Sequence, residues 1–333
     1  MKKIINDPFK VVDEMMEGIL KAHPNYFRAV NGDLRAIVRT DAPIKRKVAI
    51  ATGGGSGHLP VFMGYIGKGL IDGASIGNVF SSPTIKQMLK VTQAIDGGCG
   101  VLYLYGRYQG DMMNFDIAGE MAAEEGIEVE TVLVSDDVAS APPEEWKKRR
   151  GVAGLFFAYK MAGAKAAEGA SLKDVKSTVD RAVSVIRSLG VALSPCTIPA
   201  AGKPTFTIAD DEMEIGMGIH GEAGIRRGPM GTADEIAKIL VDSIILDLPF
   251  HVGDEVAVLV NSLGGTPLEE LYVLYRRVAE LIEKAGLNIY RPYVGRFACS
   301  MEMQGASLTL MKLDSEFKQL LDAPAETPFF IQN

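Results

Sequence analysis

The chain has 333 residues, 47% of them hydrophobic and 23% charged, and a net charge of −7. This composition is typical of a globular protein and excludes a disordered chain. The acidic balance argues against a nucleic-acid-binding protein, which needs clustered Lys and Arg side chains. No stretch reaches the roughly 18 uninterrupted apolar residues of a membrane helix, and the N-terminal "MKKIINDPFK" lacks the apolar core of a signal peptide.

Cysteine and histidine spacing gives no sign of a metal site. The three cysteines, Cys99, Cys196 and Cys299, are far apart in the chain, and we interpret them as buried thiols. None of the four histidines has a ligand at the spacing typical of zinc sites. We therefore expect a cytoplasmic protein without a metal, a membrane partner or a nucleic-acid partner.

The first half of the chain alternates between strands and helices. Three apolar runs predict buried strands, at residues 47–51, 100–105 and 129–134. Four apolar residues predict one face of the helix between the last two strands: Met112, Phe115, Ile117 and Met121. This alternation indicates a parallel, helix-covered sheet, whose ligands lie at the carboxyl ends of the strands.

A pair of helices is expected next, followed by a change in amino-acid composition. The second helix of the pair should begin at the cap Ser171 and end at Gly190. The sequence beyond it is rich in Pro and Gly, so we place a domain boundary there. The prediction is two α/β domains, residues 1–189 and 190–333, each a helix-covered sheet, with the substrate site in the cleft between them.

Two local motifs lead to further expectations. Thr266-Pro267-Leu268-Glu269 predicts a capping box with proline at the first helical position. After this capping box, an apolar stripe predicts a helix that ends near Gly286. The dense basic run at residues 147–150, "KKRR", is interpreted as a solvated helix end.

The stretch "ATGGGSGHLP" at residues 51–60 raises a functional question. A glycine-rich turn after a strand often binds phosphate, but a P-loop needs Lys-Ser/Thr where this chain has His58-Leu59. A dinucleotide fingerprint also fails, because its third glycine would fall at position 58. Either the glycines allow close approach of a small oxygen-rich ligand, or the turn is structural and the histidine incidental.

Three other side chains could carry chemistry. His220 is followed by Glu222, and in an extended segment both would point to one face, where the carboxylate could fix the imidazole tautomer. The alternative is a histidine satisfied by a backbone carbonyl. Asp111 follows a predicted strand and opens a helix, so it could stabilise the helix N-terminus or accept a proton.

The chain resembles the dihydroxyacetone kinase family, specifically its substrate-binding subunit (DhaK, the Dak1 domain). The resemblance is carried by five stretches: "GGGSGH", "FSSPT", "GD…NF", "PAAGKPTFTIADDEMEIGMGIHGE" and "NSLGGTPLEELY". It extends from "KIINDP" to "DAPAETPFF", almost the whole chain. The resemblance implies a kinase of glycerol metabolism whose glycine run lines a ketose site.

The resemblance also implies roles for individual residues. The histidine matching His220 forms a covalent hemiaminal with the keto carbon, and those matching His58 and Asp111 contact the hydroxyl that is phosphorylated. Four further residues are expected in the substrate site: Gly55, Gly57, Ser82 and Glu222. Two departures from the family pattern lie beside these residues, because Leu59 replaces an acid and Gly106 replaces a lysine.

Partners follow from the same resemblance. ATP or ADP and Mg²⁺ are expected on a helical nucleotide-binding subunit (DhaL-like), recharged in some members by a phosphotransferase-system carrier. A homodimer is also implied. The departures at Leu59 and Gly106 keep two alternatives open: an erythrulose-type tetrulose as substrate, and a non-catalytic ketose-sensing coactivator.

Overall fold

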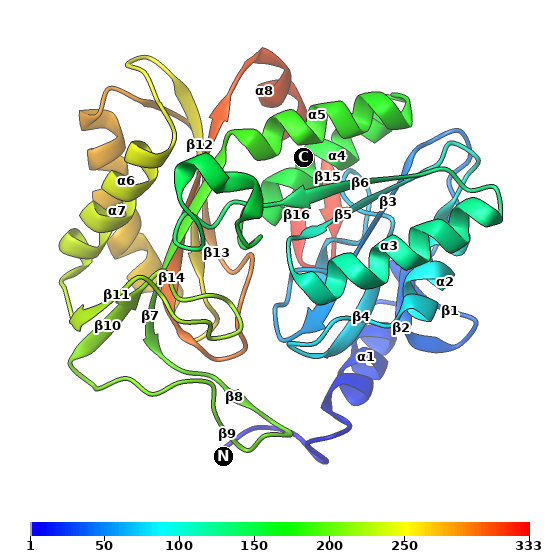
Figure 1. Cartoon of the computed structure of the whole chain (residues 1–333), viewed down its shortest axis with the longest axis horizontal. Coiled ribbons are helices and arrows are strands. Elements are labelled where there is room, and N and C mark those ends of the chain that lie inside the picture. Colours follow the sequence, from blue (N-terminus) through cyan, green and yellow to red (C-terminus); the bar gives the residue numbers. More distant parts are fainter. Residues whose placement is uncertain (1) are drawn as a thin grey trace. The chain divides into compact units, whose positions relative to one another are not determined.

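A computed structural model describes residues 2–333, which form two compact units. The first unit comprises residues up to Val134, Phe157–Ala182 and Gln319–Asn333, and the second comprises Ser135–Phe156 and Val183–Lys318. Each contains a six-stranded sheet with helices against it (Figure 1). The predicted fold class, two α/β units with helix-covered sheets, is confirmed.

The first unit is built on a sheet of order β1-β2-β4-β3-β5-β6, in which the pairs β1–β2 and β2–β4 are antiparallel and the pairs among β4, β3, β5 and β6 are parallel. Its elements are α1 (Val11–Ala22), β1 (Phe27–Val30), β2 (Asp33–Arg39), β3 (Ala49–Ser56), η1 (Met63–Tyr65), β4 (Gly73–Val79), α2 (Ile85–Ile95), β5 (Val101–Gly106), α3 (Gln109–Glu124), β6 (Val129–Val134), β15 (Ala325–Thr327) and β16 (Phe330–Gln332). Helices α4 (Leu155–Ala167) and α5 (Leu172–Ser184) belong mainly to this unit.

The second unit contains a sheet of order β11-β10-β7-β14-β12-β13, antiparallel except for the pair β12–β13. Its elements are η2 (Pro143–Lys148), β7 (Ile186–Ser194), β8 (Thr197–Ile198), β9 (Lys203–Pro204), β10 (Glu212–Ile215), β11 (Arg226–Pro229), α6 (Ala233–Asp247), β12 (Glu255–Ser262), α7 (Leu268–Lys284), β13 (Asn288–Gly295) and β14 (Gln304–Leu313), and α8 (Ser315–Asp322) spans the boundary at residue 318. Side chains from α6 and α7 pack with those of β7, β12 and β14 in one apolar core.

The division into units differs from the expected single boundary at residue 189. That position lies within β7, which pairs with β14 and β10 in the centre of the second sheet. Helix α5 correspondingly ends at Ser184 instead of Gly190, because the apolar run after it is a strand. Its expected start is confirmed: Ser171 Oγ accepts a hydrogen bond from the Asp174 N–H at 3.2 Å.

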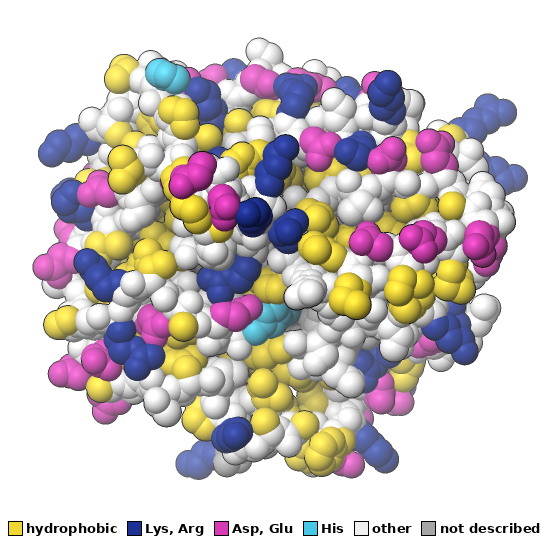
Figure 2. Space-filling model, viewed as in Figure 1, with side chains coloured by type: hydrophobic (Ala, Val, Ile, Leu, Met, Phe, Trp, Pro, Cys, Tyr) yellow, Lys and Arg dark blue, Asp and Glu magenta, His cyan; other side chains and the backbone are white. Residues whose placement is uncertain are grey.

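Helix α3 presents a different face to the sheet than the sequence suggests. Two of the four apolar side chains expected on its buried face are exposed, Ile117 (41%) and Met121 (41%), and so is the neighbouring Met113 (58%). Figure 2 shows hydrophobic side chains in a row over α3 with acidic side chains beside them. The buried face consists of Asp111, Phe115, Ala118 and Ala122. The two alanines allow the helix to lie close to the sheet, so the larger apolar residues are left outside.

The predicted capping box before α7 is wrong. Pro267 is the N-cap and no side chain caps the helix. The Thr266 hydroxyl instead accepts a hydrogen bond from the Gly305 N–H of β14 at 2.8 Å. A tertiary contact has therefore replaced the local one. The interpretation of all cysteines as buried is also wrong for Cys99, which is exposed.

Candidate functional site

The glycine run lies in a strand and not in a turn. Strand β3 continues through Gly53–Gly55 to Ser56, and the chain bends only at Gly57, whose φ is +105°. These positions have no space for side chains, since a Cβ on Gly54 would overlap the ring of Phe62. The glycines therefore let neighbouring segments pack directly on the backbone of β3, which shifts the expected turn to residues 57–58.

The segment that follows β4 packs directly against the backbone at Gly55. A Cβ at this position would lie 2.6 Å from the Ser81 nitrogen and 2.8 Å from the Phe80 Cα. Both are backbone atoms, which cannot move as a side-chain terminus would. The absence of a side chain at Gly55 thus allows residues 80–82 to pack in this position against β3.

Substituting Gly55 tests this packing. We expect Gly55→Ala to lower the free energy of unfolding by about 1–3 kcal/mol, the usual cost of overpacking. Gly18→Ala is the matched control, because Gly18 lies in α1 with nothing within 4 Å of an added Cβ, and it should stabilise the chain by about 0.5–1 kcal/mol. Urea unfolding measures both. Equal stability of the two variants would show that residues 80–82 do not depend on Gly55.

His58 is buried between aromatic rings. It is 1% exposed, and its ring stacks on Phe80 with centroids 5.0 Å apart and planes at 23°. Phe62 meets the same ring edge-on, at 6.2 Å and 86°. Two aromatic neighbours fix the plane of the imidazole, so His58 is a constrained group at the end of β3 and not an incidental surface histidine.

Asp111 lies in the first turn of α3, two residues after the first helical residue. It is 6% exposed, and the N-cap of the helix is Tyr108. Burial, then the charge of Asp116 and after it that of Asp111, raises the pKa of Tyr105. The same carboxylate adds to burial in raising the pKa of Tyr159. Asp111 is thus not the cap, and its charge acts on two buried tyrosines.

Ser82 lies against the same turn of α3. A Cβ on Gly110 would be 2.7 Å from Ser82 Oγ. The Asn114 side chain also donates a hydrogen bond to the Pro83 carbonyl at 2.8 Å, which ties α3 to the segment after β4. Ser82 additionally lines a cavity of about 250 Å³. The carboxyl ends of β3, β4 and β5 thereby bring four predicted residues to one edge of the first sheet: Gly55, His58, Ser82 and Asp111.

His220 and Glu222 lie in the second unit, in a turn after β10. The segment is not extended, because the chain turns at Ile219 and His220. The expected contact is nevertheless present: His220 Nδ1 and Glu222 Oε1 are 2.9 Å apart. The His220 backbone N–H also donates to Glu222 Oε2 at 2.9 Å. One carboxylate therefore holds both the ring and the backbone of the histidine.

The charge state of Glu222 fixes the imidazole tautomer. Burial is the largest single effect and acts to raise its pKa, but the hydrogen bonds and charge of His220, together with a backbone hydrogen bond of Glu222, outweigh burial and lower the pKa of Glu222 to about 2. The carboxylate is therefore ionised near neutral pH and can only accept hydrogen bonds. The neutral imidazole must then carry its proton on Nδ1 and its lone pair on Nε2.

Two residues that support this turn were not identified from the sequence. The buried Ser300 hydroxyl donates to the Ile219 carbonyl at 2.5 Å. Arg150 lies 3.9 Å from Glu222 Oε2. The solvated interpretation of "KKRR" is correct for Lys147 and Lys148, which are exposed, but wrong for the arginines. Arg149 is fully buried, and both of its terminal nitrogens pair with Asp247.

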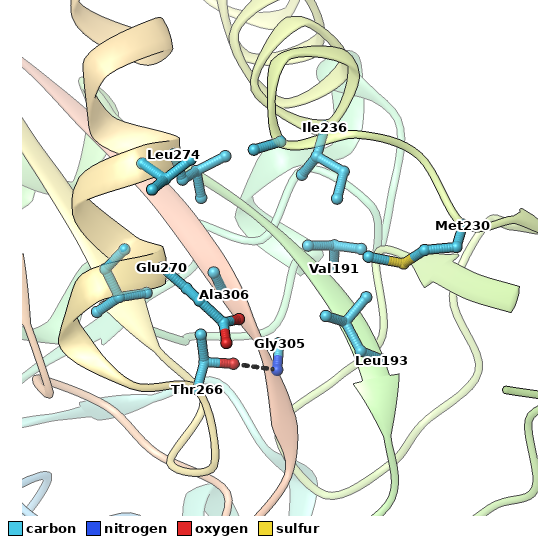
Figure 3. A pocket seen from close by; sticks show the side chains of 12 residues that line it. Val191, Leu193, Met230, Ile236, Thr266, Glu270, Leu274, Gly305 and Ala306 are labelled. Atoms are coloured by element: carbon cyan, nitrogen blue, oxygen red, sulfur yellow. Dashed lines mark hydrogen bonds between the residues drawn. The ribbon is translucent and has the colours of Figure 1, made fainter. Parts of the chain in front are cut away.

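An apolar pocket of about 170 Å³ occupies another part of the second unit (Figure 3). It lies between α6, α7, β7 and β14, and its walls include Val191, Leu193, Ile236 and Leu274. None of the predicted site residues lines it. Such a surface offers few hydrogen bonds to a sugar, so we do not assign the ketose to this pocket.

Residues 2–333 contain no group of three or more His, Cys, Asp and Glu side chains placed to hold a metal ion. Within the same range, no helix combines the length and apolar character needed to cross a membrane.

Comparison with known proteins places these features in a family. Residues 17–329 match the Dak1 domain family. The dihydroxyacetone-binding subunit DhaK of a PTS-dependent dihydroxyacetone kinase 2 from Listeria innocua is 44% identical over 330 residues, which cover 99% of both chains. An L-erythrulose kinase of Pectobacterium atrosepticum is 43% identical over 99% of this chain but only 56% of its own, so the chain spans about half of that relative.

A solved structure gives the same result for the fold. The dihydroxyacetone kinase operon co-activator Dha-DhaQ superposes with a TM-score of 0.90 and 32% sequence identity, covering 96% of this chain and 98% of its own. The family match, the identity over full length and the shared fold agree. This chain belongs to the Dak1 domain family of dihydroxyacetone kinases.

Proposed function

We propose that the chain binds a short ketose covalently on His220 and presents the ketose hydroxyl for phosphorylation. Dihydroxyacetone is the first candidate, because the relative with 99% mutual coverage is named a dihydroxyacetone-binding subunit. The observation that carries the proposal is the His220–Glu222 pair. Its 2.9 Å contact supports an imidazole with its proton on Nδ1 and its lone pair on Nε2, where it can act as a nucleophile.

The covalent step is an addition to the carbonyl group. Nε2 of His220 forms a bond to the keto carbon as the C=O π bond breaks. The former carbonyl oxygen gains a proton and the imidazole loses its Nδ1 proton, so a neutral hemiaminal results with the mass of the whole ketose. A small, weakly bound sugar is thereby held in one orientation. Glycerol has no carbonyl carbon and cannot form this bond.

The residues at the edge of the first sheet are proposed to act on the ketose hydroxyl that is phosphorylated. Asp111 would accept its proton while His58 polarises it, and the oxygen would then attack a γ-phosphoryl group, whose bond to the departing nucleoside diphosphate breaks. Ser82, Gly55 and Gly57 would line this part of the site. Positioning accounts for most of the catalysis in such transfers, and the buried, constrained settings of His58 and Asp111 support that role.

The phosphoryl donor is proposed to lie on a partner, a helical nucleotide-binding subunit that holds ATP or ADP with Mg²⁺. The name of the Listeria relative supports a partner, because it describes one subunit of a PTS-dependent kinase. We also propose a homodimer, as the family resemblance implies.

Intact-protein mass spectrometry tests the proposal. Dihydroxyacetone or erythrulose should add the mass of one whole ketose to the wild-type chain, and glycerol should add nothing. His220→Ala should show no adduct, whereas His251→Ala should match the wild type, because His251 is an exposed loop histidine. An adduct that persists in His220→Ala would overturn the assignment. Relative adduct yields also decide between the triose and the tetrulose.

A non-catalytic ketose sensor is the second candidate function. The structural match to a co-activator favours it. A sensor needs only the covalent histidine, so the presence of both His58 and Asp111 favours the enzyme. A chain that forms the adduct but supports no phosphate transfer with the complete set of subunits would be a sensor.

A further inference from the structure

We propose that Arg150 is a positioning residue for the nucleophile, because it holds the Glu222 carboxylate in place and disfavours protonation of the His220 ring. This inference rests on the proposed function and deepens it. All residues involved belong to the second unit.

The contacts of Arg150 connect three separate segments of the chain. Its Nε donates to Asp137 Oδ2 at 2.9 Å, and Nη2 lies 2.7 Å from the same oxygen. Nη2 also donates to the Gly216 carbonyl at 3.2 Å, at the start of the turn that carries His220. Nη1 lies 3.9 Å from Glu222 Oε2. One guanidinium thus reaches both the base of the turn and the carboxylate at its other side.

Asp137 provides a rigid anchor for this guanidinium. Its side chain is 4% exposed and that of Arg150 is 17% exposed. Burial raises the pKa of Asp137 to about 6, although the charge of Arg150 acts to lower it. The pair is therefore ionised at neutral pH. A lysine could not make all these contacts, because it lacks the planar fork of donors.

The absence of a side chain at Gly218 provides the space for this arrangement. A Cβ at Gly218 would overlap Glu222 Oε2 and would lie 2.5 Å from Arg150 Nη1. The backbone of Gly218 also donates to the Glu222 carbonyl at 2.9 Å. The turn is thus closed around the Arg150–Glu222 contact.

The chemical consequence concerns charge. A carboxylate next to an imidazole stabilises the protonated ring, which has no lone pair to attack a ketone. The cation of Arg150 offsets part of that stabilisation and still leaves Glu222 to accept the Nδ1 proton. The charged groups that make these contacts are Glu222, Arg150 and Asp137. Further along the turn, the Gly224 N–H donates a hydrogen bond to Glu214, and Arg227 donates to the same carboxylate.

Nitrogen NMR of the His220 ring, without ketose, tests the inference directly. Its signals are assigned by their loss in His220→Ala. We expect Arg150→Met to raise the pH at which the ring is half-protonated, and adduct formation with dihydroxyacetone to shift upward in pH likewise. Arg150→Lys should keep the midpoint near that of the wild type, because the charge remains, but should slow adduct formation.

Controls separate positioning from folding. Arg149→Lys weakens a neighbouring buried ion pair with Asp247, so it should lower the melting temperature without moving the midpoint. Asp137→Asn identifies any contribution from the titration of Asp137 itself. If Arg150→Met does not fold, Arg150→Gln removes the same charge, and the same shift is expected.

Two outcomes test the role of Arg150 and the proposed function separately. An unchanged midpoint in folded Arg150→Met or Arg150→Gln would overturn the role of Arg150, whatever the adduct result. A wild-type chain that forms no ketose adduct would overturn the proposed function, and the ketose-free NMR titration would still report whether Arg150 controls the charge of His220.

Discussion

Replacing Asp111 by asparagine is expected to lower phosphate transfer in the complete system by about 10²- to 10⁴-fold, the usual effect of losing a general base. The variant keeps the size and hydrogen-bonding capacity of the side chain, and its buried place in the first turn of α3 should tolerate the change. The covalent step uses a different residue, so the ketose adduct should still form. Mass spectrometry and a turnover assay measure the two steps separately.

Asp116→Asn is the matched control for this variant. Asp116 lies on the same helix but is exposed, and its replacement also removes one negative charge. Turnover should remain close to that of the wild type. If Asp111→Asn turned over as fast as Asp116→Asn, Asp111 would serve only to stabilise the helix N-terminus.

The chain alone is expected to bind ketose and to transfer no phosphate from Mg-ATP. Activity should appear when a helical nucleotide-binding subunit is added, because this subunit is proposed to hold the donor. Turnover by the isolated chain at ordinary kinase rates of about 1–100 per second would contradict the split arrangement.

The same reconstitution identifies the source of the phosphate. Activity with free Mg-ATP and the helical subunit indicates an ATP-dependent enzyme. A requirement for a phosphotransferase-system carrier indicates that bound ADP is recharged in place. Adduct formation without any transfer under either condition would favour the sensor.

The sequence pattern correctly predicted those elements that depend only on residues close together in the chain. The strand at Val129–Val134 and the cap Ser171 follow from apolar alternation and hydroxyl capping within a few residues. The end of α5 and the state of Thr266 could not be predicted in this way. Residues 186–190, Ile-Arg-Ser-Leu-Gly, do not distinguish a helix from a strand, and Thr266 accepts a hydrogen bond from Gly305, which is distant in sequence.

The same distinction between short-range and long-range contacts applies to the candidate site. The pairing of His220 with Glu222 was predictable because the two residues are close in sequence, although the chain reaches it by a turn instead of a strand. Arg150 was not predictable, because a dense basic run usually lies on the surface. Its partners Asp137 and Glu222 become its neighbours only in the folded second unit. Long-range ion pairs of this kind leave no spacing signal in a single sequence.

Carbon NMR with a ketose labelled at the keto carbon tests the central claim most directly. With the wild-type chain, the labelled signal should move from the carbonyl region to the region of tetrahedral carbons, and ¹⁵N-labelled histidine should split it through the new C–N bond. His220→Ala should leave the signal in the carbonyl region. A wild-type complex whose labelled carbon stays in the carbonyl region, or a tetrahedral signal that survives in His220→Ala, would contradict covalent capture by His220.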